Sequence, residues 1–183
     1  SASQRFGTKG GSKVRLATEV AALCAFSAIK NNDRVGLILS TDQVEKIVPP
    51  KKGQKHVMRV IREIMGANPE RSGTDLIVAL ETLMHVARRR SVAFLISDFY
   101  APDYSRALSL AAARHDIIPV LLTDPRDLEL PDVGLASFED FETGESVLVD
   151  TGSAEVRAHY AKQMRRHQLE TTQLFNKLGL DHC

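Results

Sequence analysis

Three continuous apolar runs of strand length alternate with segments of helical periodicity along this chain. The runs occupy residues 35–39, 92–96 and 117–122, and Val, Ile and Leu dominate each of them. Apolar residues at successive positions, rather than at every second one, are typical of a strand that is covered on both faces. The pattern therefore predicts an α/β fold in which helices cover both faces of a sheet.

The segments around these runs have the spacing of helices that pack one face on a core. Apolar residues recur at intervals of three and four, or alanines permit close packing on a sheet. We predict helices over residues 12–31, 57–65, 76–87, 104–114 and 153–178. Thr74 stands where the N-cap of the third helix is expected, and Gly179 is the expected stop of the last one.

A further strand is predicted directly after the first apolar run. Residues 44–48 mix charged and apolar side chains, and Pro49 and Pro50 follow them. Because proline cannot donate to a sheet ladder, we expect these prolines to end an edge strand that forms a hairpin with 35–39.

Proline and glycine also indicate how the later strands lie. Pro119 places its strand near an edge of the sheet or at a bulge, since proline lacks the N–H of a ladder hydrogen bond. Apolar residues on both sides of a turn at Gly144 predict a second hairpin over residues 138–149. No linker or repeat interrupts the pattern, so we interpret residues 1–183 as a single domain.

Composition limits the classes of partner and the compartment. The net charge of +1 favours neither nucleic acid nor an acidic membrane as a partner. Arg88, Arg89 and Arg90 follow a predicted helix and are interpreted as a solvated helix end. Two cysteines cannot build a disulfide framework and fit a reducing cytoplasm, and no apolar run approaches the roughly 18 residues of a membrane span. We expect a cytoplasmic location and no membrane segment in this chain.

Several enzymatic motifs are absent or incomplete. The glycine-rich stretch before Lys13 is not a phosphate-binding loop, because Ser12 and Val14 stand where that loop needs glycine and Ser or Thr. The six histidines show no zinc-binding spacing, and no Gly-x-Ser-x-Gly elbow occurs. Asp98 follows a strand as a phosphatase nucleophile does, but Tyr100 occupies the place of a second aspartate. A Mg²⁺-dependent phosphohydrolase that uses Asp98 is therefore the alternative function rather than the favoured one.

Polar residues at or beside strand ends form a set of oxygen donors. Ser1 and Ser3 open the chain, Thr74 precedes a predicted helix, and Asp98 follows the apolar run 92–96. Loops at the carboxyl ends of strands in an open α/β sheet converge on one crevice, so these residues can meet there. Hydroxyl and carboxylate oxygens suit a hard cation such as Mg²⁺, and the set predicts a metal site built for adhesion rather than turnover.

Longer stretches of the sequence carry a family resemblance. They are NNDRVGL at 31–37, PPKKG at 49–53, SGTDL at 72–76, RRRS at 88–91, ISDF at 96–99, RHD at 114–116, DPR at 124–126, ETGE at 142–145 and VDT at 149–151. Together they make the chain resemble the DUF58 family of von Willebrand factor A-like domains over nearly all of its length.

The resemblance implies a particular fold and a particular metal site. The fold is a three-layer, Rossmann-like domain whose sheet is mostly parallel, with its first, central strand lying before Ser1. The site is a metal-ion-dependent adhesion site with the pattern Asp-x-Ser-x-Ser, then Thr, then Asp. Ser1 and Ser3 match its two serines, Thr74 its threonine and Asp98 its later aspartate, while its first aspartate would lie two residues before Ser1.

The resemblance also implies a function and its partners. We expect a protein–protein interaction domain rather than an enzyme, with Mg²⁺ or Mn²⁺ as cofactor and a partner carboxylate on the metal. Because the first aspartate lies outside this chain, we expect it to bind the metal weakly or not at all. Members of the family are often encoded near MoxR-type AAA+ ATPases, which makes such an ATPase the expected partner. The absent central strand leaves open edges on the strands 35–39 and 92–96. We expect these two strands either to pair directly or to be completed by a neighbouring molecule or an exchanged segment, as in a homodimer.

Overall fold

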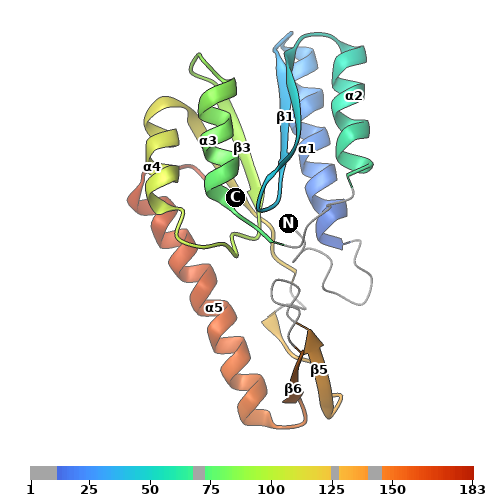
Figure 1. Cartoon of the computed structure of the whole chain (residues 1–183), viewed down its shortest axis with the longest axis vertical. Coiled ribbons are helices and arrows are strands. Elements are labelled where there is room, and N and C mark those ends of the chain that lie inside the picture. The colour runs from blue at the N-terminus through green and yellow to red at the C-terminus, as the bar shows by residue number, and fades with distance from the viewer. Residues whose placement is uncertain (1–11, 68–72, 125–127, 140–145) are drawn as a thin grey trace.

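The computed structural model describes residues 12–67, 73–124, 128–139 and 146–183. These residues form helices and strands that alternate over the first two thirds of the chain (Figure 1). In chain order they are α1 (Ser12–Lys30), β1 (Val35–Ser40), β2 (Val44–Lys51), α2 (Gln54–Met65), α3 (Leu76–Val86), β3 (Val92–Ser97), α4 (Ser105–Arg114), β4 (Asp116–Leu121), β5 (Leu135–Glu139), β6 (Ser146–Asp150) and α5 (Ala154–Lys177). Every predicted helix and strand is therefore present, and the mixed α/β class is confirmed.

The strands of the described residues form three separate pairs rather than one sheet. β1 and β2 are antiparallel, β3 and β4 are parallel, and β5 and β6 are antiparallel. Only short connections join β1 to β2 and β5 to β6, and these allow only antiparallel pairing. The chain between β3 and β4 crosses over through α4, so these two strands are parallel. The single, mostly parallel sheet that the resemblance implies is thus not formed within the described part of the chain.

The β1–β2 hairpin is confirmed, but the prediction that Pro49 and Pro50 end its second strand is wrong. Val35 pairs with Lys51 and Leu37 pairs with Val48, so the register shifts by one residue between these pairs. The two prolines lie in this bulge, where a strand tolerates residues that cannot donate to the ladder. β2 therefore continues to Lys51.

Gly36 makes this bulge possible on the facing strand. A Cβ atom at Gly36 would lie 3.0 Å from Cγ of Pro50 and 3.1 Å from the carbonyl oxygen of Val48. Any larger residue at position 36 would have to displace the proline ring or the backbone of β2. The bulge is thus built from a matched glycine and proline.

Pro119 lies on an edge of the β3–β4 pair. It is opposite Leu95 in an uninterrupted parallel register, so the bulge alternative is excluded. The backbone N–H of Cys183 donates to the carbonyl of Pro119, and the N–H of Leu121 donates to the carbonyl of Cys183. Since the nitrogen and carbonyl of one residue face the same side of a strand, the missing N–H of Pro119 faces away from β3.

The main core joins α3, α4 and β4 to the last turns of α5. Its buried members are Leu76, Leu80, Phe99, Tyr104, Leu108, Ala111, Ile117 and Phe175. A smaller cluster of Ala25, Val57 and Ile61 packs α1 on α2. Leu76 and Leu80 in the main core, and Val57 and Ile61 in the smaller cluster, are among the apolar positions that define the helical periodicity of the sequence.

The end of α5 is fixed by a glycine cap, as predicted. Gly179 has φ +66°, a conformation that favours glycine. Its N–H donates to the carbonyl of Asn176, and the N–H of Leu180 donates to the carbonyl of Phe175. This pair of hydrogen bonds is a Schellman motif, which satisfies carbonyls at the helix end and turns the chain back toward β4.

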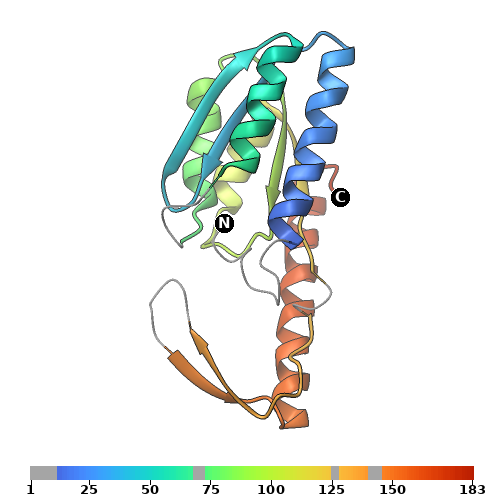
Figure 2. The ribbon, with the colours of Figure 1, turned by 90° about the vertical axis from the view of Figure 1, so that its right-hand side faces the viewer.

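α5 also gives the molecule its elongated shape. Figures 1 and 2 show α5 running away from the α/β part, with the β5–β6 hairpin at the far end of the helix. The hairpin that the sequence predicts around 138–149 is confirmed by the pairing of β5 and β6, although its turn lies outside the described residues. Within the described ranges, no helix is sufficiently long and apolar to span a membrane.

Candidate functional site

Polar loops gather where β1 and β3 end. Both strands run toward the same end of the α/β part, and α3 begins at that end (Figure 1). Thr41 and Asp42 follow β1, residues 73–75 precede α3, and Ser97 and Asp98 close β3. The carboxyl ends of strands in α/β folds are the usual place of ligand sites.

Thr74 is buried in a loop that is held against the end of β1. The N–H of Asp75 donates to the carbonyl of Thr41 at 3.0 Å, and a Cβ atom at Gly73 would lie 3.1 Å from Cβ of Asp42. The backbone on both sides of Thr74 is therefore fixed to the strand end. Only glycine fits at position 73 without displacing Asp42.

The prediction that Thr74 caps α3 is wrong, because Asp75 does so. Oδ1 of Asp75 accepts a hydrogen bond from the N–H of Ile77 at 2.8 Å, which is the geometry of an N-cap. Asp and Thr are both good caps, so sequence alone could not choose between neighbouring positions. Thr74 lies one residue before this N-cap and two residues before the first residue of the helix.

Asp98 is buried at a sharp turn after β3. Oγ of Ser97 accepts a hydrogen bond from the N–H of Phe99 at 3.0 Å, and Phe99 has φ +58°. The Phe99 ring is fully buried in the main core, which offsets the strain of this conformation. The turn therefore fixes the backbone that carries the Asp98 carboxylate, and this carboxylate is itself almost inaccessible to solvent.

The structure describes two of the four predicted ligands, Thr74 and Asp98. Thr74 and Asp98 lie on loops at the same end of the strands, as expected. Ser1 and Ser3 lie outside the described residues. The described residues contain no group of three or more His, Cys, Asp or Glu side chains that could hold a metal ion. The predicted set contains one such residue, Asp98, and depends otherwise on hydroxyl groups.

Thr41 and Asp42 are two further site residues that the sequence reasoning did not select. Thr41 is buried, and its hydroxyl donates to Oδ1 of Asp42 at 3.3 Å. Asp42 in turn contacts the position of Gly73, directly beside Thr74. The signal was a polar pair one residue after the apolar run 35–39, with Ser40 between them, which is close to the signal that singled out Ser97 and Asp98 after 92–96.

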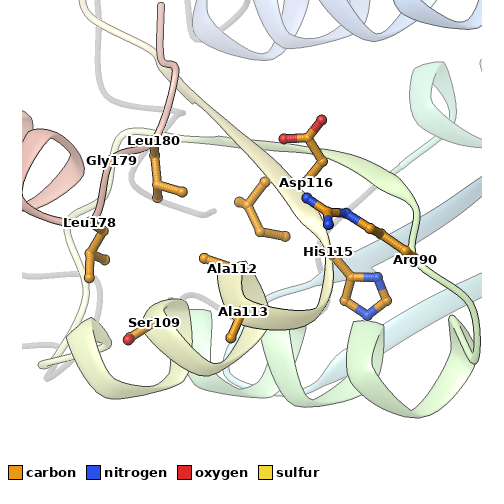
Figure 3. Close-up of a pocket in the computed structure, with 10 residues that line it drawn as sticks. Arg90, Ser109, Ala112, Ala113, His115, Asp116, Leu178, Gly179 and Leu180 are labelled. Atoms are coloured by element: carbon orange, nitrogen blue, oxygen red, sulfur yellow. The ribbon is translucent and has the colours of Figure 1, made fainter.

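A cavity of about 360 Å³ lies at the opposite end of the β3–β4 pair. Arg90, His115 and Asp116 bring polar groups to it, while α4 and the end of α5 contribute its other walls (Figure 3). His115 is 1% exposed, and neither of its ring nitrogens has a hydrogen-bond partner in the described structure. Burial, together with the nearby charge of Arg114, lowers the pKa of His115 and favours the neutral imidazole.

The chain thus has a mixed α/β fold, with hydroxyl and carboxylate side chains on the loops that follow β1 and β3 and precede α3. The chain belongs to the DUF58 family, described as "Protein of unknown function DUF58", whose model matches residues 1–170. The family resemblance drawn from the sequence motifs is therefore confirmed.

Relatives from mycobacteria share much of this sequence. Uncharacterized protein Rv1480 of Mycobacterium tuberculosis (strain ATCC 25618 / H37Rv) is 37% identical over 147 residues, which are 79% of this chain and 46% of the relative. The chain thus spans about half the length of that protein. Uncharacterized protein MAV169 of Mycobacterium avium is 33% identical over 135 residues, covering 72% of this chain and 79% of the relative.

A solved structure shares the fold. The crystal structure of an aerotolerance-related membrane protein from Bacteroides fragilis NCTC 9343 with multiple mutations to serines has a TM-score of 0.56. The similarity covers 95% of this chain and 92% of that one, at 13% sequence identity. At this identity the likeness concerns the arrangement of helices and strands only.

Proposed function

We propose that this chain is a protein–protein interaction domain of von Willebrand factor A type, with a Mg²⁺-dependent adhesion site at the carboxyl ends of its strands. The observation that carries the proposal is the burial of Thr74 and Asp98 on two fixed loops at the same end. A hydroxyl and a carboxylate held in this way are prepared to act as ligands without rearrangement.

The chemistry of the donor set fits a hard cation. Thr74, Ser1 and Ser3 would each offer a neutral hydroxyl oxygen, and Asp98 would offer its carboxylate directly or through a water. Bound there, the ion would supply a positive charge that only one carboxylate of this chain offsets. A carboxylate of the partner protein is the group that would complete the ligand set, so binding of the partner would depend on the metal.

We further propose that an additional strand lies between β1 and β3 in the complete sheet. Among the described residues β1 pairs only with β2 and β3 only with β4, which leaves a strand edge on each pair. Val92 and Phe94 of β3 are exposed, although the sequence of this strand is that of a buried one. Each unpaired buried backbone group costs about 1–3 kcal/mol, so these edges favour an added strand or a second copy of the chain.

The partner and the compartment are proposed on the family resemblance. A MoxR-type AAA+ ATPase in the cytoplasm is the partner that it favours, with the domain acting in complex assembly rather than in catalysis. The absence of a hydrolase motif from the sequence supports a binding role over turnover.

Calorimetric titration with Mn²⁺ tests the proposed site. We would use the domain extended upstream of Ser1, because the family pattern places a first aspartate two residues before it. Asp98→Asn and Thr74→Ala should each weaken binding at least tenfold. Asp116→Asn removes an exposed carboxylate from the opposite end of the strands and should leave the affinity unchanged. Equal affinities for all four proteins would refute the site.

A further inference from the structure

Two segments that are far apart in sequence lie against each other beside the proposed metal site. One is the turn after β1, residues 41–43, here called the β1 turn. The other is the loop before α3, residues 73–75, here called the Thr74 loop. Figure 1 shows the end of β1 and the start of α3 at the same end of the α/β part. Because β2 and α2 separate the two segments in the chain, only the folded protein brings them together.

The Thr74 loop contacts the β1 turn on both sides of Thr74. After Thr74, the backbone N–H of Asp75 donates to the carbonyl of Thr41 at 3.0 Å. Before it, a Cβ atom at Gly73 would lie 3.1 Å from Cβ, 3.5 Å from Cγ and 3.9 Å from Oδ2 of Asp42. The backbone of Gly73 is therefore packed directly on the Asp42 side chain. Thr74, which is 9% exposed, is carried between these two points of contact.

The β1 turn is itself held by hydrogen bonds of Thr41. Its N–H donates to the carbonyl of Gln43 at 2.9 Å, and its hydroxyl donates to Oδ1 of Asp42 at 3.3 Å. Thr41 is 2% exposed, so the turn is anchored in the protein interior. The side chain of Asp42 is in this way kept in the orientation that packs on Gly73.

Small displacements of the Thr74 loop matter for a metal ligand. Such a ligand has to be held within about 0.5 Å of its productive place. Carbon atoms in ordinary contact are at least about 3.5 Å apart, so the separation of 3.1 Å at Gly73 leaves no room for a methyl group. Replacing Gly73 by alanine would therefore shift the loop by a few tenths of an ångström, which is the scale on which the ligand is sensitive.

We propose that Asp42 is a positioning residue of the metal site, which sets the place of the Thr74 hydroxyl through its packing on Gly73. The inference rests on the proposed function, because Asp42 acts on the metal only through the ligand Thr74. Asp42 is exposed, and salt screens the interactions of exposed charges. We therefore assign the effect to the Cβ and Cγ atoms of Asp42 and not to its charge.

Calorimetric titration with Mn²⁺ at high salt, on the domain extended upstream of Ser1, tests this role. Gly73→Ala should weaken binding about tenfold, an effect typical of residues that orient a metal ligand. Asp42→Gly removes the atoms that the new methyl group meets, so the double variant should bind at least threefold more tightly than Gly73→Ala alone. Asp42→Asn keeps Cβ, Cγ and an oxygen that can accept from the Thr41 hydroxyl, and should bind like the wild type.

A matched control and a metal-free measurement separate positioning from general destabilisation. A Cβ atom at Gly36 would lie 3.0 Å from Cγ of Pro50, which is as crowded as Gly73 but at the beginning of β1. Gly36→Ala should therefore lower stability and leave the Mn²⁺ affinity unchanged. Amide hydrogen exchange in EDTA reports the loop without metal. The Asp75 amide should exchange faster in Gly73→Ala than in the wild type, and the double variant should reverse this change.

Asp98→Asn in the same titration distinguishes a failure of this inference from a failure of the proposed function. If Asp98→Asn weakens binding while Gly73→Ala binds like the wild type, or the double variant shows no recovery, the metal site stands and the positioning role is overturned. A tenfold loss in Asp42→Asn would also overturn it, because the charge of Asp42 would then be what acts. Unchanged binding by Asp98→Asn would refute the metal site, and the positioning role with it.

Discussion

The ring of Phe99 packs edge-on against the ring of Phe175, with the centroids 4.9 Å apart and the planes at 69°. Phe99 directly follows Asp98, and Phe175 lies in the last turns of α5. The packing of α5 on the core therefore supports the turn that carries the candidate ligand.

Replacing Phe175 should thus destabilise the protein and loosen the turn that carries Asp98. Phe175→Ala leaves a cavity beside Phe99 and should lower the free energy of unfolding by about 3–5 kcal/mol. Urea denaturation measures this loss. Leu169→Ala on the exposed side of α5 is the control and should change stability by no more than about 0.5 kcal/mol. A small effect of Phe175→Ala would mean that α5 does not hold the Asp98 turn.

Asp75 and Thr74 should have separable roles. Asp75→Ala removes the cap of α3 and should cost about 0.5–2 kcal/mol of stability, while Thr74→Ser should leave stability nearly unchanged. Thermal unfolding of both variants measures the difference. A loss smaller than about 0.5 kcal/mol for Asp75→Ala would show that Asp75 does not cap α3.

His115 should make stability depend on pH. Its pKa in the folded protein is lowered by burial and by Arg114, so the unfolded chain binds this proton at a higher pH than the folded one. The stability that the neutral His115 contributes is complete above the unfolded pKa of about 6.5 and is lost as pH falls below that value. Over this range the free energy of unfolding falls by at most about 1.4 kcal/mol per pH unit. Arg90 and Asp116 are the charged residues that line the cavity together with His115.

Urea titrations between pH 7.5 and 5 measure this dependence. His115→Gln should flatten the profile in that range, whereas His85→Gln, which changes an exposed histidine, should not. A profile that is the same in wild type and His115→Gln would show that another group is responsible.

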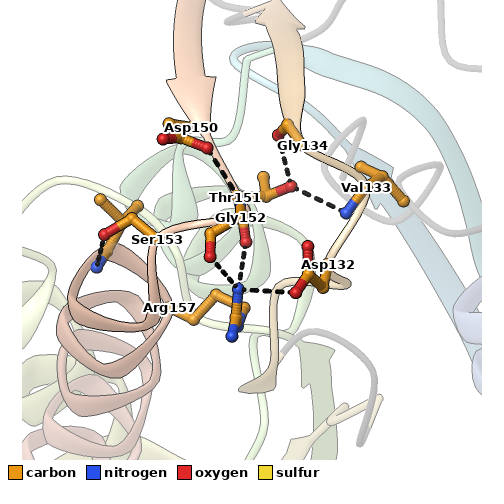
Figure 4. Close-up of polar contacts among 9 residues, drawn as sticks. Asp132, Val133, Gly134, Asp150, Thr151, Gly152, Ser153 and Arg157 are labelled. Atoms are coloured by element: carbon orange, nitrogen blue, oxygen red, sulfur yellow. Dashed lines mark hydrogen bonds and ion pairs between the residues drawn. The ribbon is translucent and has the colours of Figure 1, made fainter.

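The hydroxyl of Thr151 should hold the base of the β5–β6 hairpin (Figure 4). It donates to the carbonyl of Gly134 at 2.7 Å and accepts from the N–H of Val133 at 3.1 Å. Thr151→Val keeps the shape of the side chain but leaves Val133 without its acceptor, so it should cost about 1–3 kcal/mol. Amide hydrogen exchange in residues 146–150 should accelerate in Thr151→Val and stay close to wild type in Thr151→Ser. Equal exchange in all three proteins would argue against this role.

The sequence predicted the helices and strands well because their signals are local. The apolar spacing in α2 and α3 and the continuous runs in β1 and β3 are set by residues within a few positions of one another. Details that depend on a partner strand were missed. The prolines at 49 and 50 end no strand, because a bulge opposite Gly36 accommodates them.

Sheet assembly and the site depend on contacts between distant segments, and the sequence determines these less directly. Nothing local to β1 or β3 shows that they remain unpaired with each other in the described chain. The polar strand ends did predict that Thr74 and Asp98 lie on loops at the same end. Thr41 and Asp42 were missed because their role depends on a contact with the loop around Gly73, which follows them by about 30 residues.

The metal site is the central claim, and anomalous diffraction tests it most directly. Crystals of the domain extended upstream of Ser1 would be grown with Mn²⁺, and data would be collected at the manganese absorption edge. The account predicts one strong anomalous peak within ligand distance of both the Thr74 hydroxyl and the Asp98 carboxylate. Full occupancy by manganese at another place, with no peak beside these two residues, would contradict it.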